Sequence, residues 1–178
     1  MLIVRRYPET ARKLRILSAE APAISPQPSG MPAGTSLARK TEAAAIRATP
    51  GETELRHYSA VSRALEITRS YPNGSQRVRI VELLIWASSH TVEGAAAAVG
   101  YSPAAVKEFR AAFLGLVAVL LGFVEPWEMS TRFYKAYPGL LHRCPELRLR
   151  CEVFLRDADR EDCARYLQEL VDSSGTPG

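Results

Sequence analysis

The chain has 178 residues, of which 47% are hydrophobic and 24% are charged, proportions typical of a globular protein and not of a disordered one. Its three cysteines do not suit a secreted disulfide framework, and its longest apolar run, residues 113–124, is too short to cross a bilayer. The N-terminal MLIVRR places apolar residues before charged ones, the reverse of a signal peptide. We therefore expect a cytoplasmic protein that makes no contact with a membrane.

The net charge of +4 is unevenly distributed along the chain. Residues 1–50 carry eight Lys/Arg and three Glu, residues 51–123 carry seven basic and six acidic residues, and residues 124–178 carry eight and ten. The basic surplus therefore lies in an N-terminal arm, which can track the phosphates of a nucleic acid or simply form a solvated helix face. The candidate phosphate contacts in this arm are Arg5, Arg6, Arg12 and Lys13.

The first 50 residues divide into three segments. Residues 8–20 predict a short basic helix with Pro8 in its first turn and with Leu14 and Leu17 on a narrow apolar edge. Residues 21–36 contain four prolines and two glycines, which predicts an extended linker. Residues 37–47 return to helical composition.

From Gly51 onward the pattern is continuously helical. Apolar residues recur at steps of three and four, which predicts an amphipathic helix that ends at the turn Tyr-Pro-Asn-Gly of residues 71–74. Residues 76–87 are apolar on more than one face, so we expect this helix to pack on both sides. Arg77 and Arg79 on it are further candidate phosphate contacts, or ordinary surface charges. The apolar face of the first helix consists of Leu55, Tyr58, Val61, Leu65 and Thr68.

Residues 91–110 read TVEGAAAAVGYSPAAVKEFR and predict a helix-turn-helix, a unit that places its second helix in the DNA major groove. We expect Thr91 to cap the first helix and Gly100 to end it in a left-handed conformation. Ser102 is expected to cap the second helix, with Pro103 at its first position.

Three small or branched residues are expected to shape the crossing of these two helices. Ala96 leaves room for the second helix to cross closely, and Val99 and Val106 are spaced to seal the apolar seam. The alternative is an ordinary pair of antiparallel helices in a bundle, without DNA binding.

The second helix is expected to run from Pro103 to about Leu121 and to end at Gly122. Val106, Phe109 and Phe113 should face the core. The side chains left for DNA are two alanines that can pack on a thymine methyl, two cations suited to phosphate or guanine, and one carboxylate suited to cytosine. These candidates are Ala104, Ala105, Lys107, Glu108 and Arg110.

Residues 124–178 predict further helices, one beginning at Pro145 and a last one capped by Asp159 or Asp162. The spacing of Cys144, Cys151 and Cys163 is not that of common zinc modules, so we expect buried thiols and no metal. No nucleophile–base pair, paired carboxylates or Gly-rich phosphate loop is recognisable, and the sequence predicts neither an enzyme nor a cofactor. No strand-like alternation extends beyond a few residues, which predicts an all-α fold. The apolar face of the last helix would consist of Cys163, Tyr166, Leu167, Leu170 and Val171.

The chain resembles the ArpU/RinA-like phage transcriptional regulators over residues 7–123. The matching segments, in order, are SGMPAGTS with LARKTEAAAI, then ELRHYSAVSRALEI and RVRIVELLIW, and finally TVEGAAAAVGYSPAAVKEFRAAFLGLVAVLLG. The resemblance implies a helical protein that binds double-stranded DNA through a helix-turn-helix like that of sigma-factor region 4. RNA polymerase and a second copy of the chain are further candidate partners.

The expected organisation has three parts. Residues 1–50 form a basic arm and linker, residues 51–123 a DNA-binding domain with the helix-turn-helix at 91–110, and residues 124–178 a helical extension. The expected function is regulation of transcription in a phage or prophage. Two alternatives stay open, a helical oligomerisation or interaction protein that does not bind DNA, and a DNA-recognition protein like the small subunit of a phage terminase.

Overall fold

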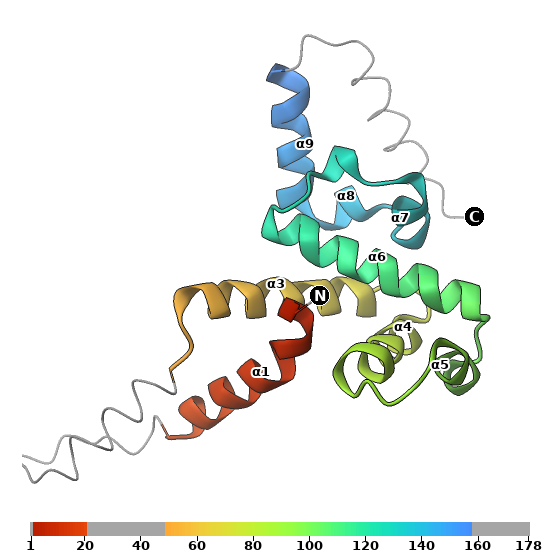
Figure 1. Ribbon diagram of the computed structural model, residues 1–178. Helices are drawn as coiled ribbons and strands as arrows, with labels where there is room; N and C mark the ends of the chain where they lie inside the picture. The colour runs from red at the N-terminus through yellow and green to blue at the C-terminus, as the bar shows by residue number, and fades with distance from the viewer. Residues whose placement is uncertain (1, 21–48, 158–178) are drawn as a thin grey trace, which may run out of the picture. The chain divides into compact units, whose positions relative to one another are not determined.

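Every element of regular structure is helical in the computed structural model, which describes residues 2–20 and 49–157 (Figure 1). Over these residues there are eight α-helices, one π-helix, one 3₁₀-helix and no strand, so the all-α prediction is confirmed. The predicted linker, the helical segment 37–47 and the helix capped by Asp159 or Asp162 lie outside the described residues. The chain forms two units, Leu2–Ser59 and the residues from Ala60 on.

The N-terminal unit pairs α1 (Leu2–Glu20) with the first half of α3 (Glu52–Arg69). The rings of Tyr7 and Tyr58 stack with their centroids 5.1 Å apart. The buried hydroxyl of Thr10 donates to Glu54 Oε1 at 2.7 Å, and Lys13 Nζ lies 3.3 Å from the same oxygen. These contacts lower the pKa of Glu54, chiefly through the hydrogen bond from Thr10.

The prediction that the first helix begins at Pro8 is wrong, because α1 begins at Leu2 and contains Pro8 in its interior. A proline inside a helix removes one backbone hydrogen bond and costs about 3 kcal/mol or more. The turns before Pro8 contribute packing that opposes this cost, since Val4 is 2% exposed and Tyr7 stacks on Tyr58. The prediction rested on local sequence alone, which does not show these tertiary contacts.

In the C-terminal unit, α3 continues from Ala60 with its apolar face in the core. Val61, Leu65 and Thr68 are buried as predicted, whereas Leu55, earlier on the helix, is 41% exposed. The helix ends before a tight turn in which Gly74 lies against α3. A Cβ on Gly74 would come within 2.5–2.7 Å of backbone atoms of the last residues of α3, so only glycine fits there.

Helix α4 (Gly74–Val81) runs directly into a π-helical turn, η2 (Glu82–Trp86). The Ala87 N–H donates to Glu82 O at 2.8 Å, five residues back. The predicted helix over residues 76–87 is therefore present, but its last turn is wider than an α-turn. It is apolar on more than one face, as expected, and its buried side chains are Val78, Ile80, Val81, Leu83, Leu84 and Ile85.

Helix α6 (Pro103–Leu121) is the centre of the C-terminal unit (Figure 1). It contacts α4 and α5 (Val92–Val99) and also α7 (Thr131–Ala136). Its bounds agree with the prediction, and Gly122 ends it with a φ of 76°. Its buried side chains include Val106, Ala112, Phe113, Leu116, Val117, Val119 and Leu121.

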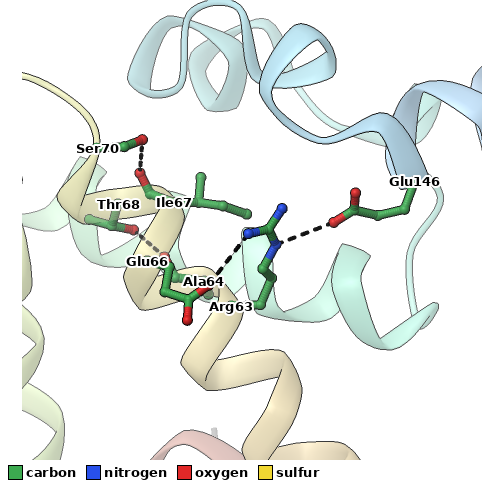
Figure 2. Close-up of polar contacts among 7 residues, drawn as sticks. All are labelled: Arg63, Ala64, Glu66, Ile67, Thr68, Ser70 and Glu146. Carbon is green, nitrogen blue, oxygen red and sulfur yellow. Dashed lines mark hydrogen bonds and ion pairs between the residues drawn. The ribbon is translucent and has the colours of Figure 1, made fainter.

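Residues 124–157 pack into this same unit through η3 (Pro126–Glu128), α7, α8 (Leu140–Arg143) and α9 (Pro145–Asp157). The start of α9 at Pro145 confirms the prediction. Arg63 of α3 lies 3.4 Å from carboxylate oxygens of both Glu66 and Glu146, which links α3 to α9 (Figure 2). Figure 2 also shows the Thr68 hydroxyl bonded to the Ala64 carbonyl, at 2.7 Å. No helix in the described part of the chain is long and apolar enough to cross a membrane.

Candidate nucleic-acid interface

The first helix of the candidate interface, α5, begins and ends as its sequence predicts. Thr91 caps it, because Thr91 Oγ1 accepts a hydrogen bond of 3.1 Å from the Gly94 N–H. Gly100 ends it with a φ of 74°, in the left-handed region that favours glycine.

A turn of three residues, 100–102, connects α5 to α6. The Ser102 hydroxyl accepts from the Ala105 N–H at 3.2 Å, and Pro103 occupies the first helical position. Both predicted caps are therefore present. The capping chemistry fixes the start of α6, because each polar side chain pairs a backbone N–H that the helix itself leaves unbonded.

Small side chains allow α5 and α6 to pack closely. Ala96 is 3% exposed and Val106 is fully buried, as expected, while Val99 is only half-buried and seals the seam in part. Phe109 is also half-buried. Its ring meets that of Tyr101 edge-on, with the centroids 5.4 Å apart.

The predicted DNA-contacting residues lie on the outer side of α6, but they are not equally accessible. Ala104, Lys107 and Glu108 are exposed, whereas Ala105 and Arg110 are half-buried. Ala111 is exposed as well and continues the row. Residues 104, 107, 108 and 111 follow the helical spacing of three and four, so they form one continuous exposed face, called here the α6 face.

Arg77 is held inside the fold. Its Nη1 donates to the Ala136 carbonyl at 2.6 Å, and its guanidinium lies 4.5 Å from the centroid of the Phe109 ring. Its Nε is buried without a hydrogen-bond partner among the described residues. The guanidinium thus connects α4, α6 and the end of α7. Arg79 is exposed and forms an ion pair of 2.7 Å with Glu82.

The candidate phosphate contacts of the basic arm lie on α1. Arg5, Arg6 and Arg12 are exposed, whereas Lys13 is engaged by the carboxylates of Glu9 and Glu54 at 3.5 and 3.3 Å. Arg6 and Lys13 line a cleft of about 570 Å³ within the N-terminal unit, together with both carboxylates. Because Glu9 and Glu54 line the cleft together with Arg6 and Lys13, their negative charges weaken the attraction of this cleft for a phosphate.

A groove of about 330 Å³ runs beside the α6 face. Lys107, Glu108, Ala111 and Ala112 of α6 line it. Met129 and Ser130, which lead into α7, and Arg132 and Phe133 of its first turn line the other side. Sequence reasoning missed Arg132, since nothing in the local pattern of residues 124–135 connects it with a helix twenty residues earlier. Only the packing of α7 on α6 brings it there.

The cysteines have the character of core residues. Cys144 and Cys151 are buried, and burial raises the pKa of each thiol to about 11. Among the described residues, no group of three or more His, Cys, Asp or Glu side chains is placed to hold a metal ion. Cys163 lies outside the described residues.

No protein-family model matches this chain, and comparisons with curated proteins and with solved structures found no match either. The resemblance to the phage regulators therefore stays a prediction. The α5–α6 unit consists of two capped helices joined by a short turn, and it presents one exposed row of small and charged side chains. This geometry is the basis for a proposal about its function.

Proposed function

We propose that this protein is a DNA-binding transcriptional regulator of phage or prophage type, and that α6 enters the major groove. The observation that carries the proposal is the α6 face. Ala104, Lys107, Glu108 and Ala111 are exposed, while Val106 of the same helix is buried. A helix held from behind in this way presents its outer side chains on a rigid support.

The width of α6 suits a major groove. An α-helix with its side chains is about 10–12 Å in diameter. The major groove of B-DNA is about 12 Å wide. The alanines at the two ends of the face have short side chains, so the helix backbone can approach the base edges closely.

The side chains offer a small set of contacts. Lys107 can donate to guanine or to a phosphate, Glu108 can accept from cytosine, and Ala104 can pack on a thymine methyl. The half-buried Ala105 and Arg110 lie beside this row and contribute with the parts of their side chains that reach solvent. Because few polar groups reach the bases, we expect modest sequence specificity.

A helical interaction protein without DNA binding is the alternative, based on the apolar stretch 111–123. Six residues between Ala112 and Leu121 are buried within the unit itself, and Leu114 and Leu120 are half-buried, so little of that stretch is left for a partner to cover. The large apolar side chains that stay exposed in this part of the unit are Phe123, just after α6, and Leu149 and Val153 of α9, at 64%, 57% and 46%. They can be altered without touching the α6 face, so association and DNA binding are testable separately.

The test begins with selection from a random duplex library, followed by mobility-shift titrations of the recovered sequence over a salt series. We expect retardation of the selected duplex that weakens as salt rises. Lys107→Glu should reduce affinity for it at least tenfold, since it replaces a contacting cation by an anion. Circular dichroism should show an unchanged helical content, because Lys107 is exposed.

Arg156→Glu is the matched control, because it makes the same charge reversal at an exposed residue in the last turn of α9. It should leave affinity within about twofold of the wild type. Failure of the wild-type protein to retard any duplex at micromolar concentration would overturn the proposal. Run-off transcription from a promoter that carries the selected site then separates a regulator from a DNA-packaging protein.

A further inference from the structure

The groove beside the α6 face carries two cations from different parts of the chain. Lys107 comes from α6 and Arg132 from the second residue of α7. Both are exposed, and neither forms an ion pair with any described residue. Other cations of this unit, such as Arg63 and Arg148, are paired with carboxylates. Two exposed cations with no ion-pair partner among the described residues favour an anion in the groove.

Arg132 stands on a rigid support. The two residues that follow it on α7, Phe133 and Tyr134, are 3% and 6% exposed, and the Tyr134 hydroxyl donates to the Pro126 carbonyl at 2.6 Å. Gly115 of α6 allows the close approach, since a Cβ there would lie 2.6 Å from Met129 Cε and 3.3 Å from Phe133 Cδ2. The start of α7 is therefore fixed against α6.

We propose that Arg132 binds a phosphate of the DNA backbone at this groove, with Lys107 on the opposite rim. This inference rests on the proposed function. A helix with its side chains is about 10–12 Å in diameter and the major groove is about 12 Å wide, so groups beside the α6 face lie near a bordering strand. The groove runs along α6 from Lys107 to Ala112, and Arg132 on its α7 side is placed to meet the backbone of that strand.

The charge of the groove fits one phosphodiester. Lys107 and Arg132 contribute two positive charges and Glu108, which also lines the groove, one negative charge. The net charge of +1 balances the single charge of a backbone phosphate. Arg132 can form two parallel hydrogen bonds to phosphate oxygens, the geometry that favours arginine at such contacts.

The experiment compares Arg132→Gln with Arg156→Gln, an exposed arginine that likewise has no ion pair with a described residue. Affinity is measured from about 0.05 to 0.3 M salt on the selected duplex and on an unrelated one. Each lost phosphate contact lowers the slope of log affinity against log salt by about 0.9. Arg132→Gln should therefore weaken binding about eightfold at 0.1 M salt and about fourfold at 0.2 M, on both duplexes alike.

Arg156→Gln should keep the wild-type slope and affinity. If the wild type binds and Arg132→Gln behaves like Arg156→Gln, the phosphate site is wrong while the proposed function stands. A loss confined to the selected duplex would also overturn the site, because a backbone contact carries no sequence information. If the wild type binds no duplex, the proposed function fails, and the phosphate site fails with it.

Discussion

Replacing Thr68 by valine tests how much a buried hydroxyl pair contributes to the stability of the C-terminal unit. The Thr68 hydroxyl donates to the Ala64 carbonyl at 2.7 Å, and its oxygen lies 3.0 Å from the Tyr137 hydroxyl oxygen. Because the one hydroxyl proton of Thr68 is directed at Ala64, Tyr137 must be the donor to Thr68. The pair joins α3 to the residue that ends α7, 69 positions later.

The two single substitutions should differ in cost. Thr68→Val keeps the branched shape but leaves the Tyr137 hydroxyl buried without an acceptor, which costs about 1–3 kcal/mol. Tyr137→Phe removes the donor and leaves Thr68 bonded to Ala64, so its cost should be about 0.5–1.5 kcal/mol. The double variant has no orphaned hydroxyl, and its cost should fall below the sum of the two by about 1 kcal/mol.

Urea unfolding followed by circular dichroism gives the four free energies of this cycle. Thermal melts should agree, with a shift of about 2–4 °C for each kcal/mol in a chain of this size. Thr131→Val is the control, because Thr131 is an exposed threonine and its replacement should change stability by less than about 0.5 kcal/mol. Additive costs in the double variant, within about 0.3 kcal/mol, would refute the donor assignment and the coupling it implies.

Other substitutions and conditions test the same core. Gly74→Ala should lower the free energy of unfolding by about 1–3 kcal/mol, because its Cβ would meet backbone atoms at 2.5–2.7 Å. Gly94→Ala, whose nearest neighbours would lie at 3.5 Å, should raise it by up to about 1 kcal/mol, and urea melts that reverse this order would contradict the packing. Burial raises the pKa of Cys144 and Cys151 from 9.0 to about 11 and that of Tyr71 from 10.0 to about 12. Because the fold favours the neutral forms of these groups, their contribution to the free energy of unfolding should be fully present below about pH 9 and should be lost as the pH rises towards 12. A urea midpoint that stays constant from about pH 7 to 11 would contradict this expectation. With the third cysteine replaced by serine, a thiol reagent such as DTNB should label both remaining cysteines in urea and neither in the native protein within minutes.

The features that the sequence predicts correctly depend on neighbours along the chain. Thr91 and Ser102 cap their helices, and Gly100 takes a left-handed conformation, because each acts on backbone groups within three or four residues of itself. The bounds of α6 follow from the same local chemistry, with Pro103 at its start and Gly122 at its end. Such features are readable without knowledge of the fold.

The features that the sequence does not predict depend on contacts between distant residues. Arg77 appears along the chain as a surface cation, yet its guanidinium bonds the Ala136 carbonyl, 59 residues later. The start of α1 before Pro8 depends on packing of the first turns, and the position of Arg132 depends on α7 meeting α6. Periodicity shows that a helix has an apolar face, but it does not show which element covers that face.

The π-turn Glu82–Trp86 holds one residue more than an α-helical turn at this point. A π-turn closes its hydrogen bonds over five residues where an α-turn uses four. Deleting one residue there would restore an α-helical ladder and leave the residues before the turn nearly in their present phase, so Val78 and Val81 would stay in the core. The same deletion inside α6 would rotate one half of that helix by about 100° relative to the other and would turn buried side chains such as Phe113 out of the core. The loss of a single residue should therefore cost the fold less in this turn than in α6.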